Sequence, residues 1–450
     1  MKGKSGKIAV IILVTLVLLV GGLYAGIGYF LGQALERQGV RDVAGRLSAR
    51  FLDSYAGYLP LASDGLSISS PGFLAQTSPP SACVEIRASH PHARCNLIEL
   101  WHHKWRIDNL LIQHLQAAYG PAAAWFIDRN EFADPELTPP LQSDSPIEID
   151  LHEIDIAKTD LFWGDTPEQG GGELRDVHTN FFPRDQNLVI HGRDGTFRQA
   201  KWPVARVQQF KLLYARPELR IDEGSLTFGG PSAITILGNF RVERAGSFDL
   251  NLTFAHCPVA PFLWGVQRSQ LEGEFDGTAH LQKETGQTES ARAIGSIAVT
   301  KAFLKNIEGL QHVADFTGRE EFARLPVDQV KADYEWNYPI LTVKNFVFES
   351  SRLIVVKGEF TIRGNKLDGE FQIGVSPDVV EKFPGAREEI FTRIDEGYLW
   401  TKLTVSGAPD QLREDLRPRL VRAAQNHFAN GSVAPTFKPG QTIIEAIEGL

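Results

Sequence analysis

The sequence predicts a mainly β protein with an N-terminal transmembrane helix and a few short helices. Three observations predict this fold class. An apolar run without charged residues extends from Ile8 to Leu31. Residues 65–407 repeatedly alternate apolar and polar side chains, which is the pattern of half-buried strands. The chain also contains 41 glycines and 25 prolines, which suit many short strands better than long helices.

The apolar run predicts a membrane anchor. As a helix it would be about 36 Å long, enough to cross a hydrocarbon core of about 30 Å. A cleaved signal peptide is the alternative, but its apolar part is usually only about 7–15 residues long. Lys2, Lys4 and Lys7 precede the run and favour a cytoplasmic N-terminus. We therefore expect residues 1–32 to be a cytoplasmic tip and anchor in the inner membrane, with the bulk of the chain in the periplasm.

After the anchor the spacing of apolar residues is first that of a helix and then that of strands. Leu35, Val40, Val43 and Leu47 recur near helical spacing, so we expect residues 33–60 to form a juxtamembrane helix or linker. From residue 61 the alternation of strands begins, and residues 61–290 are predicted as an N-terminal β-rich region.

Individual runs show the alternation clearly. In "FDLNLTF" and in "KLDGEFQIGV" the apolar residues take every second position. "PIEIDLHEIDI" alternates with a one-residue slip that we interpret as a bulge. "RGNKLDG" predicts a tight antiparallel connection between two strands. Short amphipathic helices are predicted at "IEGLQHVADFTGREEFARL" and at "LREDLRPRLVRAAQNHF".

Two runs, "LTVKNFVFES" and "RLIVVKGEFTI", are apolar on both predicted faces. Such strands fit a sheet that curves around a ligand, or a sheet covered on its second face. A concave apolar lining would suit a lipid acyl chain, whereas a sandwich core needs no ligand. From periodicity alone we favour the sandwich core.

The stretch "HPHARCNLIELWHHKW", residues 90–105, concentrates histidine and tryptophan. Its histidines and cysteines match none of the common zinc spacings, so we expect no metal site. We interpret it as two strands joined by a turn near "WHHK"; a helix over residues 97–115 is the alternative. Cys83 and Cys95 are a possible disulfide, with two buried thiols as the alternative, and either leaves Cys257 unpaired.

Composition and motifs disfavour several function classes. A net charge of -9 lacks the excess of basic residues that is typical of proteins that bind nucleic acid. The chain has no G-x-S-x-G elbow, no H-E-x-x-H helix, no EF-hand loop and no dinucleotide-binding glycine pattern. We therefore expect a protein that is not an enzyme and that uses no cofactor.

A resemblance to a known family rests on residues 295–420. The segments "GSIAVTKAFLKNIEGLQHVADFTG", "SSRLIVVKGEFTIRGNKLDGEF" and "VSGAPDQLREDLRPRL" resemble those of the AsmA-like family of bacterial envelope proteins. The resemblance divides the rest of the chain into an AsmA-like β region, residues 291–420, and a C-terminal tail, residues 421–450. It implies an elongated, curved antiparallel sheet that forms an apolar groove beside the inner membrane.

The resemblance also implies a function. We expect the groove to bind phospholipid or transfer it passively, in homeostasis of the cell envelope and biogenesis of the outer membrane, with other envelope proteins as possible partners. A membrane-anchored scaffold that assists outer-membrane protein assembly, binding protein rather than lipid, is the alternative. Candidate groove-lining residues are Phe248, Leu250, Leu252, Phe254, Phe346, Phe348, Leu367, Phe371 and Ile373.

Overall fold

The computed structural model of the chain describes residues 54–58, 62–63, 67–69, 72–77, 84–94, 104–119, 148–164, 171–184, 187–215, 217–241, 246–263, 265–284, 291–350, 352–408, 411–429, 436–438 and 441–442. The predicted anchor, Cys83, Cys95 and residues 101–103 of the turn near "WHHK" lie outside these residues. So does most of the predicted juxtamembrane helix or linker, but its described part, Ser54–Tyr58, is a strand of the sheet and neither helix nor linker. Within the ranges given, no helix combines the length and apolar character that a membrane crossing requires.

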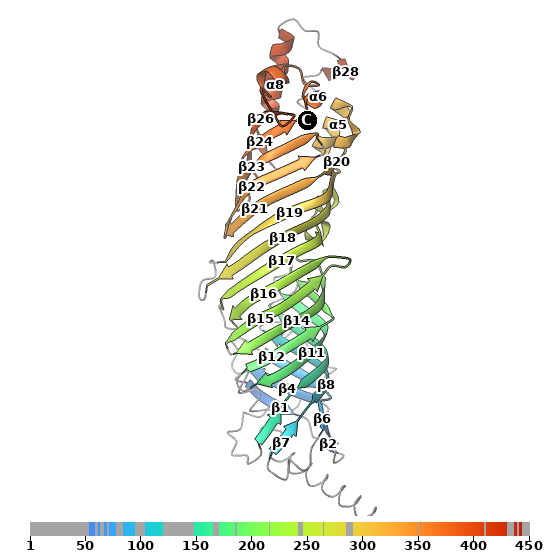
Figure 1. Ribbon diagram of the computed structural model, residues 1–450, viewed down its shortest axis with the longest axis vertical. Helices are drawn as coiled ribbons and strands as arrows, with labels where there is room; N and C mark the ends of the chain where they lie inside the picture. Colours follow the sequence, from blue (N-terminus) through green and yellow to red (C-terminus); the bar gives the residue numbers. More distant parts are fainter. Residues whose placement is uncertain are drawn as a thin grey trace, which may run out of the picture. The chain divides into compact units, whose positions relative to one another are not determined.

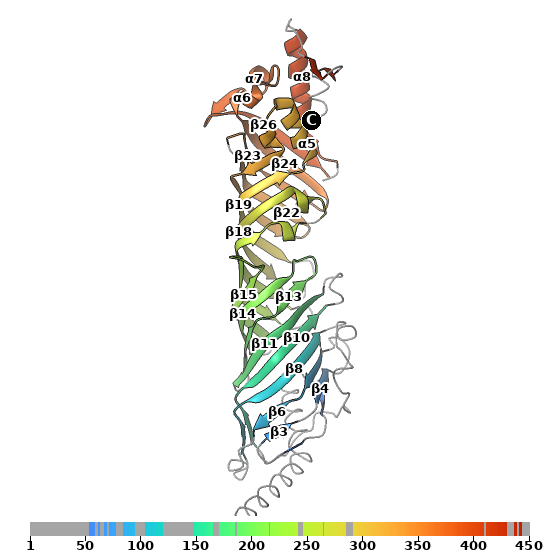
Figure 2. The same ribbon diagram turned by 90° about the vertical axis from the view of Figure 1, so that its right-hand side faces the viewer.

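The chain divides into two compact units, and most of the described residues in both are β-strand (Figures 1 and 2). Unit 1 comprises Met1–Leu226 with Val242–Arg244, and unit 2 comprises Thr227–Arg241 with Ala245–Leu450. The sequence-based boundary at residue 290 falls in unit 2, between two strands that pair with each other.

Unit 1 contains a mixed sheet and, separate from it, a small parallel sheet of two strands. Its strands are β1 (Ser54–Tyr58), β2 (Ala62–Ser63), β3 (Ser67–Ser69), β4 (Gly72–Thr77), β5 (Val84–Ser89), β6 (His92–Arg94), β7 (Lys104–Ile107), β8 (Leu110–Tyr119), β9 (Glu148–Leu151), β10 (Ile154–Trp163), β11 (Gly172–Arg184), β12 (Asn187–Arg193), β13 (Thr196–Gln199), β14 (Ala205–Ala215) and β15 (Glu218–Thr227). Antiparallel pairs join β1 to β4, β4 to β5 and β5 to β8. Others join β10 to β11, β11 to β12 and β12 to β14.

Three expectations are wrong in unit 1. The sheet is not purely antiparallel, because β8 pairs with β10 in parallel, as β7 does with β9. The slip in "PIEIDLHEIDI" is not a bulge: the chain leaves the β7–β9 pair after Leu151 and enters the main sheet at Ile154. The helical alternative for residues 97–115 fails over its described part, since residues 104–107 and 110–115 are strand.

Unit 2 is one antiparallel ladder with helices at one end. The strands are β16 (Ala233–Arg241), β17 (Phe248–Pro258), β18 (Leu271–Lys283), β19 (Arg292–Lys305), β20 (Arg324–Val327), β21 (Gln329–Asn337), β22 (Ile340–Ser350), β23 (Ile354–Arg363), β24 (Lys366–Val375), β25 (Arg393–Asp395), β26 (Tyr398–Gly407) and β27 (Arg413–Glu414). Most neighbours in sequence pair with each other, but β20 and β21 both pair with β19, and β24, β25 and β27 all pair with β26. A small hairpin, β28 (Thr436–Lys438) with β29 (Gln441–Thr442), follows.

Two local features explain the register of this ladder. The predicted tight connection in "RGNKLDG" is confirmed: Arg363 pairs with Lys366, and Gly364 supplies a positive φ of 61° that a two-residue turn favours. In β22 a register shift falls between Val343 and Phe346, where Asn345 has a φ of 52°. This bulge turns the apolar residues before and after it to the same face, so "LTVKNFVFES" only looks apolar on both faces.

Most of the helices gather at the end of unit 2 where β20, β24 and β26 lie (Figure 1). They are α5 (Glu308–Thr317), η4 (Glu320–Phe322), α6 (Pro377–Val380), α7 (Ala386–Glu389) and α8 (Leu416–Ala429). Two short helices, η3 (Ala260–Phe262) and α4 (Gln267–Gln270), lie elsewhere, in the connection between β17 and β18, and contact β18. Both predicted amphipathic helices are confirmed as α5 and α8, and α5 ends at Gly318 with a left-handed φ of 71°. Phe316, Leu325, Val380, Leu399 and Ala424 are among the buried residues that pack these helices on the sheet end.

Candidate functional site

One face of the unit 2 sheet is apolar from β16 to β26. Cross-strand register places its residues in rows; for example, Phe348 lies opposite Val330 and Val356, and Val356 lies opposite Ile373. We call the following set the apolar face: Ile234, Ile236, Gly238 and Phe240; Phe248, Leu250, Leu252 and Phe254; Phe275, Gly277, Ala279, Leu281 and Lys283; Ala293, Gly295, Ile297 and Val299; Val330, Ala332, Tyr334 and Trp336; Leu341, Val343, Phe346 and Phe348; Val356, Gly358, Phe360 and Ile362; Leu367, Gly369, Phe371 and Ile373; and Thr401, Leu403 and Val405.

The candidate lining residues from the sequence all lie on this face. Leu252 and Ile373 are 6% and 8% exposed, whereas the other members of that set are half-buried. A sandwich core would bury such side chains completely. Phe348 and Ile373 pack in the core under the helices, whereas the partial exposure of the other residues favours a face that is open to a ligand.

Aromatic rings and glycines shape this face together. Phe346, Phe360 and Phe371 come from three neighbouring strands, with ring centroids 6.0–6.1 Å apart. The Phe371 ring lies against Gly358 and Gly369, where an added Cβ would come within 2.7 Å of it. A side chain at either glycine would collide with this ring, so the two glycines make room for it on the face.

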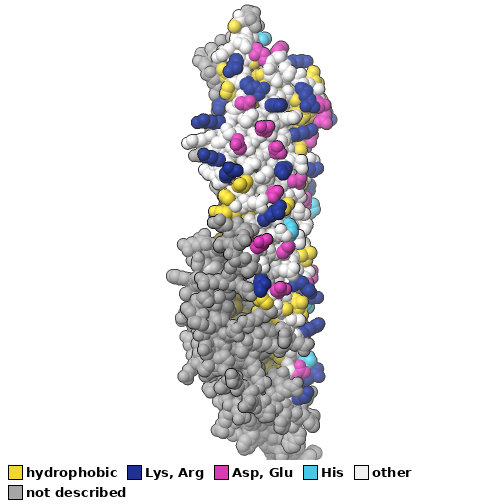
Figure 3. Space-filling view, turned by 90° about the vertical axis from the view of Figure 1, so that its left-hand side faces the viewer, with side chains coloured by type: hydrophobic (Ala, Val, Ile, Leu, Met, Phe, Trp, Pro, Cys, Tyr) yellow, Lys and Arg dark blue, Asp and Glu magenta, His cyan; other side chains and the backbone are white. Residues whose placement is uncertain are grey.

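The opposite side of the same strands, the charged face, is polar and exposed. On β18 it carries Glu274, Asp276 and His280, and on β23 it carries Lys357 and Glu359. Basic and acidic side chains are interspersed over the surface visible in Figure 3. The sheet of unit 2 is thus amphipathic, with water-facing charge on one side.

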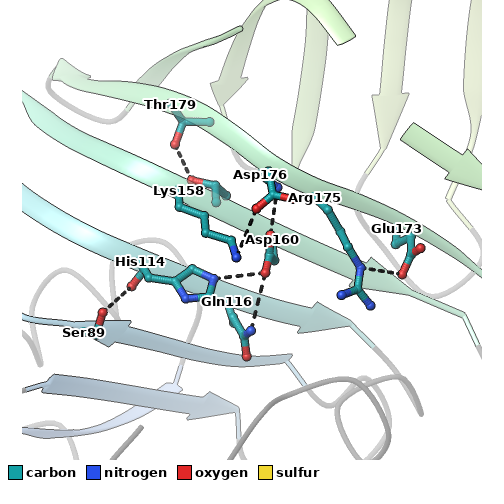
Figure 4. A network of polar contacts seen from close by, with 10 residues as sticks. Ser89, His114, Gln116, Lys158, Asp160, Glu173, Arg175, Asp176 and Thr179 are labelled. Carbon is teal, nitrogen blue, oxygen red and sulfur yellow. Dashed lines mark hydrogen bonds and ion pairs between the residues drawn. The ribbon is translucent and has the colours of Figure 1, made fainter. Parts of the chain in front are cut away.

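Unit 1 contains a buried group of polar residues that the sequence did not reveal. We call Glu85, Arg87, Ser89, His114, Gln116 and Asp160 the polar cluster; each is 2–6% exposed. Figure 4 shows four of them, Ser89, His114, Gln116 and Asp160. Register brings them to one face, because Arg87 pairs with Gln116, and Gln116 with Asp160. Alternation alone marks this face as polar and therefore gives no sign that it is buried; the exposed fractions of the side chains show the burial.

Asp160 is the centre of the polar cluster. Its Oδ2 lies 3.0 Å from His114 Nε2 and accepts a 3.4 Å hydrogen bond from Gln116, while its Oδ1 accepts one of 2.9 Å from the Asp176 N–H. Burial pushes the pKa of this carboxyl upward, but the hydrogen bonds from His114 and Asp176 and nearby positive charge outweigh burial and leave the pKa lowered. Asp160 is therefore a carboxylate at neutral pH. Glu85 and Arg87 form a second buried ion pair, 2.6 Å long.

A shallow depression of about 460 Å³ lies elsewhere in unit 1, lined by residues of β11, β12 and β14 among others. Arg193 Nε donates to His178 Nδ1 at 3.0 Å, so His178 Nε2 carries the hydrogen and donates to Asp155 Oδ1 at 2.7 Å. None of the side chains that line it is Ser, Thr or Cys. The contacts describe a hydrated network of polar side chains.

The remaining candidates from the sequence are its cysteines and histidines. Cys257 is buried, with its thiol 3.6 Å from the carbonyls of Ala233 and Ala255, and burial raises its pKa. Among the described residues, no group of His, Cys, Asp and Glu is arranged to hold a metal ion. The possible disulfide between Cys83 and Cys95 lies outside the described residues and stays a prediction.

Comparisons with protein-family models, with curated proteins and with solved structures find no match to this chain. The resemblance to the AsmA-like family therefore stays a prediction from the sequence.

Proposed function

We propose that this chain is an inner-membrane-anchored, periplasmic protein of the AsmA-like type, whose apolar face in unit 2 binds phospholipid acyl chains and lets them move passively. The half-exposed apolar face backed by a charged face is the observation that carries the proposal. Such a face without an occupant leaves apolar surface in contact with water, which is unfavourable by about 25 cal/mol per Å².

The chemistry of an acyl chain fits this face. Each methylene moved from water to an apolar contact gains about 0.8 kcal/mol. Rows of Phe, Leu, Ile and Val offer this contact on strand after strand without a directional hydrogen bond, so a chain slides between equivalent positions. Passive movement of this kind requires no nucleotide or catalytic group.

The sequence supplies the rest of the proposal. Ile8 to Leu31 would tether the protein to the inner membrane, the source of the phospholipid. The function would then lie in maintenance of the cell envelope and the outer membrane, as the resemblance implies.

Native mass spectrometry of the full chain, extracted in detergent, tests the proposal. We expect phospholipid to co-purify with the wild type and with Thr361→Asp, which adds a carboxylate on the charged face of β23. We expect it to be lost from Phe360→Asp, which adds one on the apolar face of the same strand. Thermal unfolding shows whether each variant is folded, and Ile362→Asp, nearer the strand end, replaces Phe360→Asp if that variant is not.

Equal lipid in both variants, or none in the wild type, would contradict lipid binding by this face. Co-purification of unfolded outer-membrane proteins in place of lipid would instead support the scaffold alternative.

A further inference from the structure

Lys283 is the one charged residue on the apolar face as defined above. It is the last residue of β18 and lies directly opposite Phe248, which in turn lies opposite Phe240. Asp249 and Gln282, its neighbours across and along the strands, belong to the charged face. The Lys283 side chain is half-buried, so its position combines an apolar surrounding with access to solvent.

No acidic side chain among the described residues neutralises Lys283. Two carboxylates on neighbouring strands already have partners: Asp249 Oδ1 lies 2.8 Å from His280 Nε2, and Glu335 Oε1 lies 2.9 Å from Arg292 Nη2. Both pairs lie on the charged face. The ammonium is therefore available to an anion that approaches along the apolar face.

Aromatic side chains lie at the same ends of the neighbouring strands. Phe240 is 39% exposed, and Tyr338, 59% exposed, packs edge-on against Trp336 at 6.3 Å. Figure 3 looks at the edge of unit 2 where β18 and β21 end, and shows hydrophobic side chains beside lysines and arginines there. Aromatic residues next to a cation are typical of the boundary between acyl chains and headgroups.

We propose that Lys283 binds the phosphate of a lipid headgroup while the acyl chains of the same molecule lie on the apolar face, so that the protein selects phosphate-bearing lipids over neutral ones. This inference rests on the proposed function and adds the residue that recognises the headgroup. An apolar face alone would bind tails of either kind equally, whereas an ammonium in partly dehydrated surroundings favours the anionic lipid.

Two lipids that differ only in the phosphate test the proposal. Dioleoyl phosphatidic acid and dioleoylglycerol are mixed in equal amounts with the detergent-purified full chain, and the bound ratio is read by native mass spectrometry. We expect the wild type to favour phosphatidic acid about tenfold, the effect of one charge-assisted hydrogen bond. Lys283→Gln should bring the ratio close to one, and Lys283→Arg should restore most of the preference.

Lys366→Gln is the matched control, because Lys366 is an exposed lysine at another strand end on the charged face, and it should keep the wild-type ratio. An unchanged ratio in Lys283→Gln with both lipids bound overturns the inference but leaves the proposed function standing. Absence of both lipids from the wild type overturns both. Displacement of phosphatidic acid by millimolar inorganic phosphate would show that the site takes free phosphate, and would overturn the assignment to a lipid.

Discussion

Gly295 shows how a single glycine determines packing on the apolar face. Tyr334 on β21 reaches across Gly295 on β19 and donates a 2.9 Å hydrogen bond to the Thr278 carbonyl on β18. A Cβ at residue 295 would collide with that backbone carbonyl and would lie 2.7 Å from Tyr334 Oη. Burial also raises the pKa of Tyr334, so the phenol remains a hydrogen-bond donor at neutral pH.

We predict that Gly295→Ala destabilises the protein by about 1–3 kcal/mol, the range for forced overpacking. Chemical denaturation of the purified protein measures the change. Ser296→Ala, at the adjacent residue on the opposite face, should cost less than about 1 kcal/mol, since it removes one exposed hydroxyl contact with Thr278. Equal stability of Gly295→Ala and the wild type would show that the strands separate easily here.

Cys257 tests whether the core of unit 2 excludes solvent. Its thiol is fully buried and burial raises its pKa, so little thiolate forms at neutral pH. In a Cys83→Ser, Cys95→Ser variant, we predict that iodoacetamide alkylates Cys257 at least about tenfold more slowly in the native than in the denatured protein. Mass spectrometry measures the rate. Rapid native labelling would mean that β17 opens to solvent.

The last long strand of unit 2, β26, pairs with β25 and β27 at the two ends of its outer edge, and between them the edge is protected by helix α8 and by Asp415, the residue before it. Arg419 Nη1 donates to the Lys402 carbonyl at 2.7 Å, and Arg419 Nη2 donates to Thr401 Oγ1 at 2.6 Å. Asp415 Oδ1 accepts from the Thr404 N–H at 2.8 Å. These side chains occupy edge groups that would otherwise be free to pair with another strand, a known cause of association between sheets.

We therefore predict that Arg419→Ala lowers the free energy of unfolding by about 1–3 kcal/mol, because it removes hydrogen bonds from a charged donor. It should also increase self-association, measured by light scattering after size-exclusion chromatography. Arg422→Ala, an exposed arginine later in the same helix, is the control and should change neither property. A monomeric, fully stable Arg419→Ala protein would mean that the edge needs no such protection.

The polar cluster links strands β8 and β10 of unit 1 and makes their pairing sensitive to acid. The pKa of Asp160 is lowered from 3.8 in the folded protein, so its stabilising contribution is fully present above that value. The contribution is lost as the pH falls through the lower folded-state pKa, where the folded protein too binds the proton.

We predict that Asp160→Asn is destabilised by about 1–3 kcal/mol at pH 7, and that the difference from the wild type shrinks below pH 3.8. Urea unfolding at a series of pH values measures both effects. Asp108→Asn removes an exposed carboxylate of the same unit and should show little difference at any pH. A constant difference down to the lowest pH would show that Asp160 acts by shape and not by charge.

Elements defined by local pattern were predictable from the sequence, and those defined by distant pairing were not. The strand "FDLNLTF", the turn at Gly364, and helices α5 and α8 follow from period and turn chemistry within a few residues. The parallel pairing of β8 with β10 joins segments separated by residues 120–153, and no local rule specifies it. Val356, Gly358 and Phe360 were missed as lining residues, because the adjacent apolar residues Ile354, Val355 and Val356 make this strand look apolar on both faces.

Across unit 2 as a whole, strict alternation separates two environments over a series of strands. Odd and even positions of β17 and of β24 differ in exposure: Leu250 and Phe371 are half-buried, whereas their neighbours Asn251 and Gln372 are exposed. A single small binding site would need this contrast on only a few strands. Its persistence from β16 to β26 is what a ligand that moves along the sheet would require.

Photo-crosslinking along the sheet distinguishes a continuous path from one local site. We predict that a photoreactive residue crosslinks to phospholipid when it replaces Leu250, Tyr334 or Phe371 on the apolar face. The same residue at Asn251, Glu335 or Gln372, the next position on each strand, should give at least about tenfold less product, because adjacent side chains of a strand point to opposite faces. Mass spectrometry of membranes irradiated with the full chain identifies the adducts. Crosslinks confined to one of the three strands would support a fixed site and argue against movement along the face; equal yields within each pair would mean that lipid contacts the protein without regard to its faces.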